Sequence, residues 1–111
     1  MEILFQTARL GKICNSLELL QKTYGQANAD KIRCRLAVLG AATTLLAVPT
    51  KRPDRRHALK GQLAGCYAVD VLHPFRIVFR AWGTRAATQG RGSTAARDIT
   101  AIIILEIVDY H

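Results

Sequence analysis

Hydrophobic residues follow helical spacing in the first third of the chain. The run MEILF, residues 1–5, is rich in β-branched and aromatic side chains and predicts a short strand. Apolar residues then recur every three or four positions from Leu10 to Tyr24, and Gly25 stands where a helix would end. This pattern predicts one amphipathic helix of about five turns.

A second helical pattern follows Gly25. Its apolar positions are Ala29, Ile32, Leu36 and Leu39. The other side of this helix carries Lys31, Arg33 and Arg35, which we interpret as a solvated face or as part of an RNA-facing surface. The chain is therefore expected to open with a strand and a helical hairpin.

The spacing changes after Pro49. Pro49 and Pro53 bracket the basic loop TKRPDRR and prevent a continued helix. Alternation in GCYAVDV and HPFRIVFR predicts two antiparallel strands joined by a tight connection at His73-Pro74. One face of these strands should pack on the helices, and the other should present arginines.

The last third of the chain combines a polar segment with a strongly apolar one. Residues 81–98 have no hydrophobic period and predict a long mobile loop, whereas ITAIIILEIV is apolar on both faces and predicts a central strand. The expected fold class is α+β, with an N-terminal strand and helical hairpin packed on a mostly antiparallel sheet of four to five strands. Residues 1–111 are predicted to form a single domain.

The net charge of the chain indicates which kinds of partner it binds. Sixteen Lys and Arg oppose eight Asp and Glu, for a formal net charge of +8. Residues 31–60 hold eight of these bases and one acid. A basic stripe of this kind indicates a surface for nucleic acid or an acidic protein, with a solvated charged face as the plainer interpretation. The candidate RNA-binding residues are Lys51, Arg52, Arg55, Arg56 and Arg80.

Cysteine content and hydropathy indicate the compartment. Cys14, Cys34 and Cys66 are odd in number and far apart, which favours free thiols in a reducing cytosol. The N-terminus has no long apolar segment typical of a signal peptide, and the longest nearly uncharged stretch is too short to span a bilayer. We expect a soluble, cytoplasmic protein.

Any catalytic reaction is expected to rely on the protein's own side chains. The chain has no P-loop, HExxH, GxSxG or metal-ligand spacing, so we expect no cofactor and no metal. Cleavage of RNA without a metal needs a base for the 2′-hydroxyl proton, an acid for the leaving oxygen and cations for the charge on phosphorus. If segments 55–60 and 76–80 are strands beside the last strand, one sheet face can gather His57, Lys60, Arg76, Asp109, Tyr110 and His111.

Several segments resemble one known family. RRHALKGQLAGCYAVDVLHPFRIVF followed by ITAIIILEIVDYH is similar to the HigB branch of the RelE/ParE superfamily of bacterial toxins, the plasmid-maintenance killer proteins. The N-terminal half, from MEILF through KIRCRL, also resembles that family. The H-x-L-K-G element and the D-Y-H ending carry the resemblance, which implies a RelE-like fold.

The resemblance implies a type II toxin that is a ribosome-dependent mRNA endonuclease, an mRNA interferase, neutralised by a cognate HigA-type antitoxin. His57 matches the histidine of the H-x-L-K-G element, and Asp109, Tyr110 and His111 match the terminal triplet tied to cleavage. Lys60 and Arg76 match basic positions expected to contact phosphate. The expected partners are the antitoxin, the ribosome and the mRNA in its A site, with no membrane.

Two alternative functions stay open from the sequence. A ParE-like toxin of the same fold would poison DNA gyrase by binding it, without enzymatic activity. An inactivated member would bind only RNA or its antitoxin. For single residues, His73 before Pro74 is more simply a turn residue, and Tyr110 and His111 can be a polar end to a strand.

Overall fold

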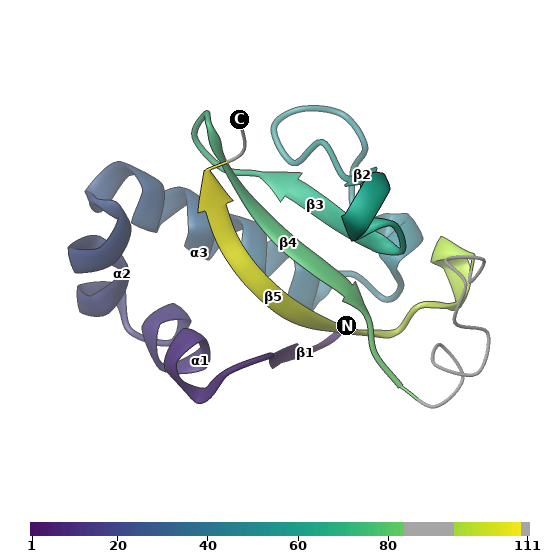
Figure 1. Ribbon diagram of the computed structural model, residues 1–111, viewed down its shortest axis with the longest axis horizontal. Coiled ribbons are helices and arrows are strands. Elements are labelled where there is room, and N and C mark those ends of the chain that lie inside the picture. The colour runs from purple at the N-terminus through teal and green to yellow at the C-terminus, as the bar shows by residue number, and fades with distance from the viewer. Residues whose placement is uncertain (84–94, 110–111) are drawn as a thin grey trace.

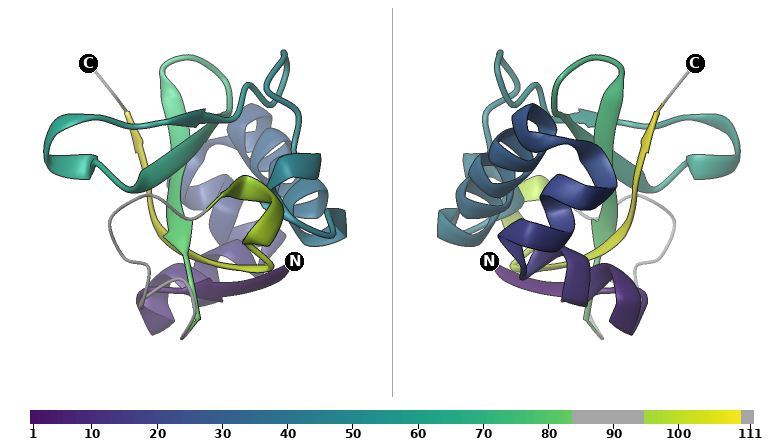
Figure 2. Two further views of the ribbon diagram at one scale, coloured as in Figure 1. Left: turned by 90° about the vertical axis from the view of Figure 1, so that its right-hand side faces the viewer. Right: turned by 90° about the vertical axis from the view of Figure 1, so that its left-hand side faces the viewer.

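A computed structural model of the chain describes residues 1–83 and 95–109. One layer is a five-stranded sheet in the order β1-β5-β4-β3-β2. Helices cover one face of this sheet and leave the other face without a helical layer (Figures 1 and 2). The α+β class expected from the pattern is confirmed.

The strands pair mostly antiparallel. Strand β3 (Cys66–Asp70) pairs with β4 (Phe75–Ala81), and β4 pairs with β5 (Ala101–Asp109). Strand β1 (Glu2–Phe5) runs parallel to β5, while the two-residue β2 (His57–Ala58) closes the other edge. The predicted hairpin through His73-Pro74 is confirmed, and the predicted last strand lies between β1 and β4, inside the sheet.

The first predicted helix is wrong in extent, because two helices replace it. Helix α1 (Ala8–Cys14) ends before Ser16, and α2 (Leu17–Tyr24) begins after it. The Ser16 hydroxyl accepts the backbone N–H of Leu19 at 3.2 Å and so caps α2. The Asn15 side chain donates to the carbonyl of Gly11 at 2.8 Å, which satisfies the end of α1.

Helix α3 (Gln26–Ala41) crosses behind the sheet (Figure 1). Ala29, Ile32 and Leu39 are fully buried beneath the sheet, as predicted. Arg35 is also buried, with 7% of its surface exposed, so its assignment to a solvated or RNA-facing surface is wrong. The charge is tolerated because Arg35 has two polar partners, the Asp70 carbonyl at the end of β3 and the Asp54 carboxylate in the loop before His57.

The core lies between the helices and one face of the sheet. It contains Val69, Ile77, Phe79, Ile102 and Ile104 from three neighbouring strands. Arg76 and Arg80 alternate with Ile77 and Phe79 along β4, so they belong to the opposite face. The predicted division of β4 into an apolar face and an arginine face is confirmed.

The segment predicted as a mobile loop is described only in part. Strand β4 continues through Ala81, and a 3₁₀ turn, η3 (Ala96–Asp98), precedes β5. Residues 84–94 lie outside the described residues. Within the described ranges, no helix has the length and hydropathy needed to cross a membrane.

Candidate active site and nucleic-acid interface

We use the name open face for the sheet face opposite the helices; its central residues Ala68 and Val78 are buried, whereas Arg80 and Glu106 are exposed. Pairing places His57, Ala68, Val78 and Glu106 in one row across four strands. Side chains in one row of a sheet project to the same face, and positions two residues along a strand share it. Asp70, Arg76 and Arg80 therefore also lie on the open face.

The strand order corrects one expectation about the site. The 55–60 segment does not lie beside the last strand, because β3 and β4 separate β2 from β5. At a strand spacing of about 4.8 Å, β2 and β5 are about 14 Å apart. Of the two segments, 76–80 is the one beside β5. The strand order could not be predicted from the sequence, because the hydrophobic period of a strand does not show which other strand pairs with it.

His57 is held by the backbone of its own segment. Its Nδ1 lies 2.7 Å from the carbonyl oxygen of Arg55. A carbonyl oxygen only accepts hydrogen bonds, so Nδ1 carries the proton and Nε2 of the neutral ring carries the lone pair. Nε2 is buried and has no hydrogen-bond partner among the described residues. Unpaired buried nitrogens are rare, which marks His57 as a candidate functional residue.

Asp70 joins two of the candidate cations. Arg55 Nε and Nη2 donate to the two carboxylate oxygens of Asp70, at 2.6 and 3.2 Å. This hydrogen bonding raises the pKa of the Arg55 guanidinium, against the opposing effect of burial. Arg76 Nε lies 3.8 Å from Asp70 Oδ1. One carboxylate therefore brings two guanidinium groups together at the end of β3.

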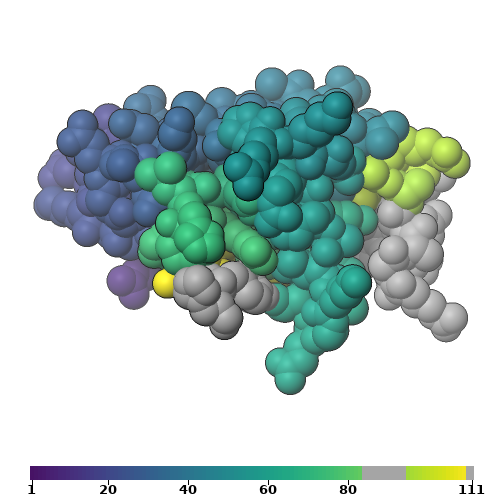
Figure 3. Space-filling view, turned by 90° about the horizontal axis from the view of Figure 1, so that it is seen from above, coloured from purple at the N-terminus to yellow at the C-terminus, as the bar shows by residue number. Residues whose placement is uncertain are grey.

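The 51–56 loop is anchored to the sheet at the same place. The backbone N–H of Asp70 donates to the carbonyl of Asp54 at 2.8 Å. Arg35 Nε donates to the carbonyl of Asp70 at 2.8 Å and lies 3.8 Å from Asp54 Oδ1. Figure 3 shows this teal loop beside the green β3–β4 connection on the upper surface. Helix, loop and strand thus meet around Asp70.

The other predicted cations are placed in different ways. Lys51, Arg52 and Lys60 are exposed, and Lys60 lies just before the 3₁₀ turn η2 (Gly61–Leu63), which projects away from the helices (Figure 2). Arg56 donates from Nε to the carbonyl of Val48 at 3.0 Å, so it also holds the loop. Arg80 is exposed at the far end of the open face, with its guanidinium 5.6 Å from the ring centre of Trp82.

Asp109 ends β5 at the edge where β3 ends and β4 begins. It pairs with Phe75, whereas Arg76 pairs with Val108. Strand alternation therefore assigns Asp109 to the face opposite that of Arg76. Tyr110 and His111 lie outside the described residues. The catalytic roles expected for the terminal triplet stay predictions.

Sequence reasoning missed three acidic residues of this region. Asp54 and Asp70 organise the cations, and Glu106 is the acidic side chain of β5 on the open face. Glu106 had a detectable signal, because it interrupts an apolar strand two positions before Val108. Asp54 and Asp70 had none, since their partners come from other elements. Among the described residues, no group of three or more His, Cys, Asp and Glu side chains is placed to hold a metal ion.

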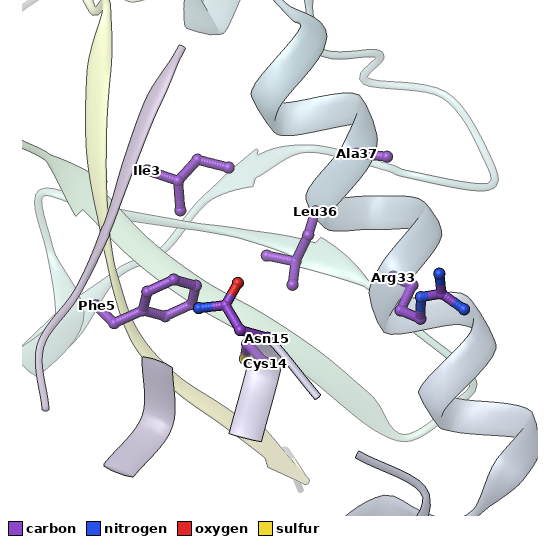
Figure 4. A pocket seen from close by; sticks show the side chains of 7 residues that line it. All are labelled: Ile3, Phe5, Cys14, Asn15, Arg33, Leu36 and Ala37. Atoms are coloured by element: carbon purple, nitrogen blue, oxygen red, sulfur yellow. The ribbon is translucent and has the colours of Figure 1, made fainter. Parts of the chain in front are cut away.

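A separate groove lies on the helical side, near β1. Its lining comes from β1, the end of α1 and the middle of α3 (Figure 4), and its volume is about 560 Å³. Most of the lining is apolar, with Asn15 and Arg33 as its polar side chains. None of the predicted site residues contributes to this groove, so it is distinct from the open face.

Two solved structures share the fold of this chain. A YoeB/ParE toxin from Agrobacterium tumefaciens superposes with a TM-score of 0.59 at 14% identity, covering 100% of both chains. A YoeB-YefM complex from Staphylococcus aureus matches with a TM-score of 0.56 at 16% identity, covering 100% of this chain and 97% of the other. At such identities the similarity establishes a common fold.

Sequence comparisons give no further assignment. No protein-family model matches the chain, and no curated protein matches it.

Proposed function

We propose that this protein is the toxin of a type II toxin-antitoxin pair and that it acts as a HigB-type endoribonuclease on mRNA. His57 carries the proposal, because its ring is oriented with Nε2 as the proton acceptor on a face that also holds arginines. The RelE/YoeB-like fold and the resemblance of the H-x-L-K-G and D-Y-H segments support it. The formal charge of +8 suits an RNA substrate.

The proposed reaction is an internal transesterification. The 2′-oxygen attacks phosphorus, its proton passes to His57 Nε2, and the bond from phosphorus to the 5′-oxygen breaks. The products are a 2′,3′-cyclic phosphate and a 5′-hydroxyl. Lys60, Arg76 and Arg55 stabilise the developing negative charge, and His111 or Tyr110 protonates the leaving oxygen. Asp109 remains a candidate base in place of His57.

Nε2 is covered in the free protein, which adds a requirement to the proposal. Side chains around the ring must move when RNA binds, so that the 2′-hydroxyl can approach within about 3 Å of the nitrogen. Binding in the ribosomal A site would supply the energy for this movement. We accordingly propose that cleavage depends on the ribosome and takes place in the cytoplasm.

The proposed inhibitor is a HigA-type antitoxin. The structural neighbour from Staphylococcus aureus was solved as a complex of YoeB with YefM, which supports a protein partner for this fold. An acidic antitoxin segment would be attracted by the same basic residues that bind RNA.

Primer extension on mRNA from cells that briefly express the protein tests the function. We expect ribosome-dependent cuts with 5′-hydroxyl ends and loss of these cuts in His57→Ala. Folding and antitoxin binding should be retained in that variant. Cuts at wild-type rate in His57→Ala would remove His57 from the mechanism.

The shared fold also accommodates a gyrase poison, since one solved neighbour is described as a YoeB/ParE toxin. A supercoiling assay with purified gyrase separates the two functions. Inhibition of gyrase together with intact mRNA in translating extracts would replace the endonuclease by a ParE-like toxin.

A further inference from the structure

Asp70 makes hydrogen bonds through three different groups, two of them to the loop before His57 and one to α3. Its N–H donates to the Asp54 carbonyl, its carbonyl accepts from Arg35 Nε, and its carboxylate accepts two hydrogen bonds from Arg55. No catalytic or RNA-binding role was expected for Asp70 from the sequence. Its position in β3 is fixed by pairing with Arg76 of β4. The sheet therefore holds Asp70 in place, so that Asp70 can orient the neighbouring loop.

Arg55 is the loop residue whose side chain Asp70 binds. Its backbone has φ +48°, in the left-handed region that few residues other than glycine adopt. Its N–H donates to the carbonyl of Lys51 at 2.9 Å, which closes a turn, and its side chain is held by Asp70. The turn and the ion pair together hold a backbone conformation that Arg55 would rarely adopt alone.

The Arg55 backbone also contacts the His57 ring. The carbonyl of Arg55 is the group against which His57 Nδ1 lies, at 2.7 Å. We propose that Asp70 is a positioning residue, which through the Arg55 side chain holds the Arg55 carbonyl against Nδ1 and leaves Nε2 as the proton acceptor. The catalytic meaning of this inference rests on the proposed endonuclease function.

Asp70 has a second effect that opposes the first. Its carboxylate pairs with Arg55 and lies 3.8 Å from Arg76 Nε, so it partly neutralises two guanidinium groups on the open face. Removing this charge should strengthen attraction to phosphate while it loosens the His57 ring. A positioning role therefore predicts tighter RNA binding together with slower cleavage, which neither unfolding nor a plain binding role would produce.

The test uses Asp70→Asn, which keeps the size of the side chain and both backbone hydrogen bonds. Asp30→Asn is the matched control, because it removes the same charge from an exposed position on α3. On ribosomes programmed with mRNA, we expect Asp70→Asn to lower kcat by about 10²-fold and to lower KM, and we expect its binding to free single-stranded RNA to depend more steeply on salt. Asp30→Asn should leave kcat unchanged, and Asp70→Glu should recover part of the loss.

The His57 ring can also be followed without any activity. Nitrogen-15 NMR of the imidazole at about pH 8 reports which ring nitrogen of the neutral form holds the proton. We expect the Nδ1–H form in the wild type and in Asp30→Asn, and a mixture of the two forms in Asp70→Asn.

The two measurements separate the inference from the function on which it rests. The same ring signals and the same kcat in Asp70→Asn and Asp30→Asn would overturn the positioning role, even for an active ribonuclease. Altered ring signals in a protein that cuts no RNA would uphold the positioning of His57 and overturn the proposed function.

Discussion

Arg35 of α3 and Asp54 of the 51–56 loop form a buried ion pair, with Arg35 Nε 3.8 Å from Asp54 Oδ1. Both residues are less than a tenth exposed, at 7% and 6%. Asp54 Oδ1 has no hydrogen bond from any described residue, so the arginine charge is its main compensation. The pair connects the helical layer to the loop that precedes His57.

Replacing Arg35 should destabilise the protein strongly. Arg35→Ala leaves the Asp54 carboxylate buried without its cation and removes the hydrogen bond to the Asp70 carbonyl. We expect the free energy of unfolding to fall by about 3–5 kcal/mol, measured by urea denaturation.

Arg33→Ala is the matched control, because Arg33 is exposed on the same helix and carries the same charge. Its effect should stay within about 0.5 kcal/mol. Equal losses in the two variants would mean that helix propensity and net charge, rather than the buried pair, account for the effect of Arg35.

Alkaline pH should weaken the fold through Cys14. Burial raises the pKa of the Cys14 thiol to about 11 from 9.0 in the unfolded chain. Below pH 9 the thiol is neutral in both states, and its contribution to stability is fully present. Between pH 9 and 11 the unfolded chain loses the proton first, so stability falls as pH rises, by at most about 2 kcal/mol.

Thermal unfolding followed by circular dichroism from pH 8 to 11 checks this expectation, with Cys14→Ala as the comparison. The variant should lose less stability over the interval than the wild type does. Tyr24 contributes in the same direction, because burial also raises its pKa, so some alkaline decline should persist. Identical pH profiles for both proteins would exclude Cys14 as the source.

Arg80 should bind RNA without contributing to the chemical step. Its exposed guanidinium lies on the open face, four positions along β4 from Arg76. Arg80→Ala should weaken binding to single-stranded RNA and reduce the slope of log K against log salt by about 0.7, the value for one phosphate contact. The cleavage rate at saturating substrate should stay at the wild-type level.

Arg9→Ala provides the control for Arg80, since Arg9 is exposed on α1, on the helical side of the molecule, and the change in net charge is the same. Titrations by fluorescence anisotropy at several salt concentrations measure both variants. If Arg9→Ala reduces the slope as much as Arg80→Ala does, RNA binding follows total charge, and the open face has no special role.

The prediction of helix and strand faces from sequence succeeded where burial alone decides the structure. Ile32 and Leu39 of α3 and Ile77 and Phe79 of β4 were placed correctly, because each side chain's polarity records whether its own face is buried. The break between α1 and α2 was missed, since the apolar period continues through Asn15 and Ser16. There the cap formed by the Ser16 hydroxyl outweighs the period.

Part of the candidate site was also predictable. His57 and Arg76 lie on the same sheet face, and their catalytic roles stay predictions. The sequence does not reveal that two strands separate β2 from β5, nor that Asp109 pairs with Phe75. Pairing order and register depend on contacts between distant segments, and a local pattern carries no information about them.

The sequence by itself determined the apolar faces, the basic character of residues 31–60 and the chemical types available for catalysis. Only the tertiary structure decided which of those groups act together. It buried Arg35, paired the Arg55 side chain with Asp70, and placed the Arg55 carbonyl against Nδ1 of His57. The reason is physical: a side chain's polarity is a property of its own position, whereas an ion pair exists only when folding brings two positions into contact.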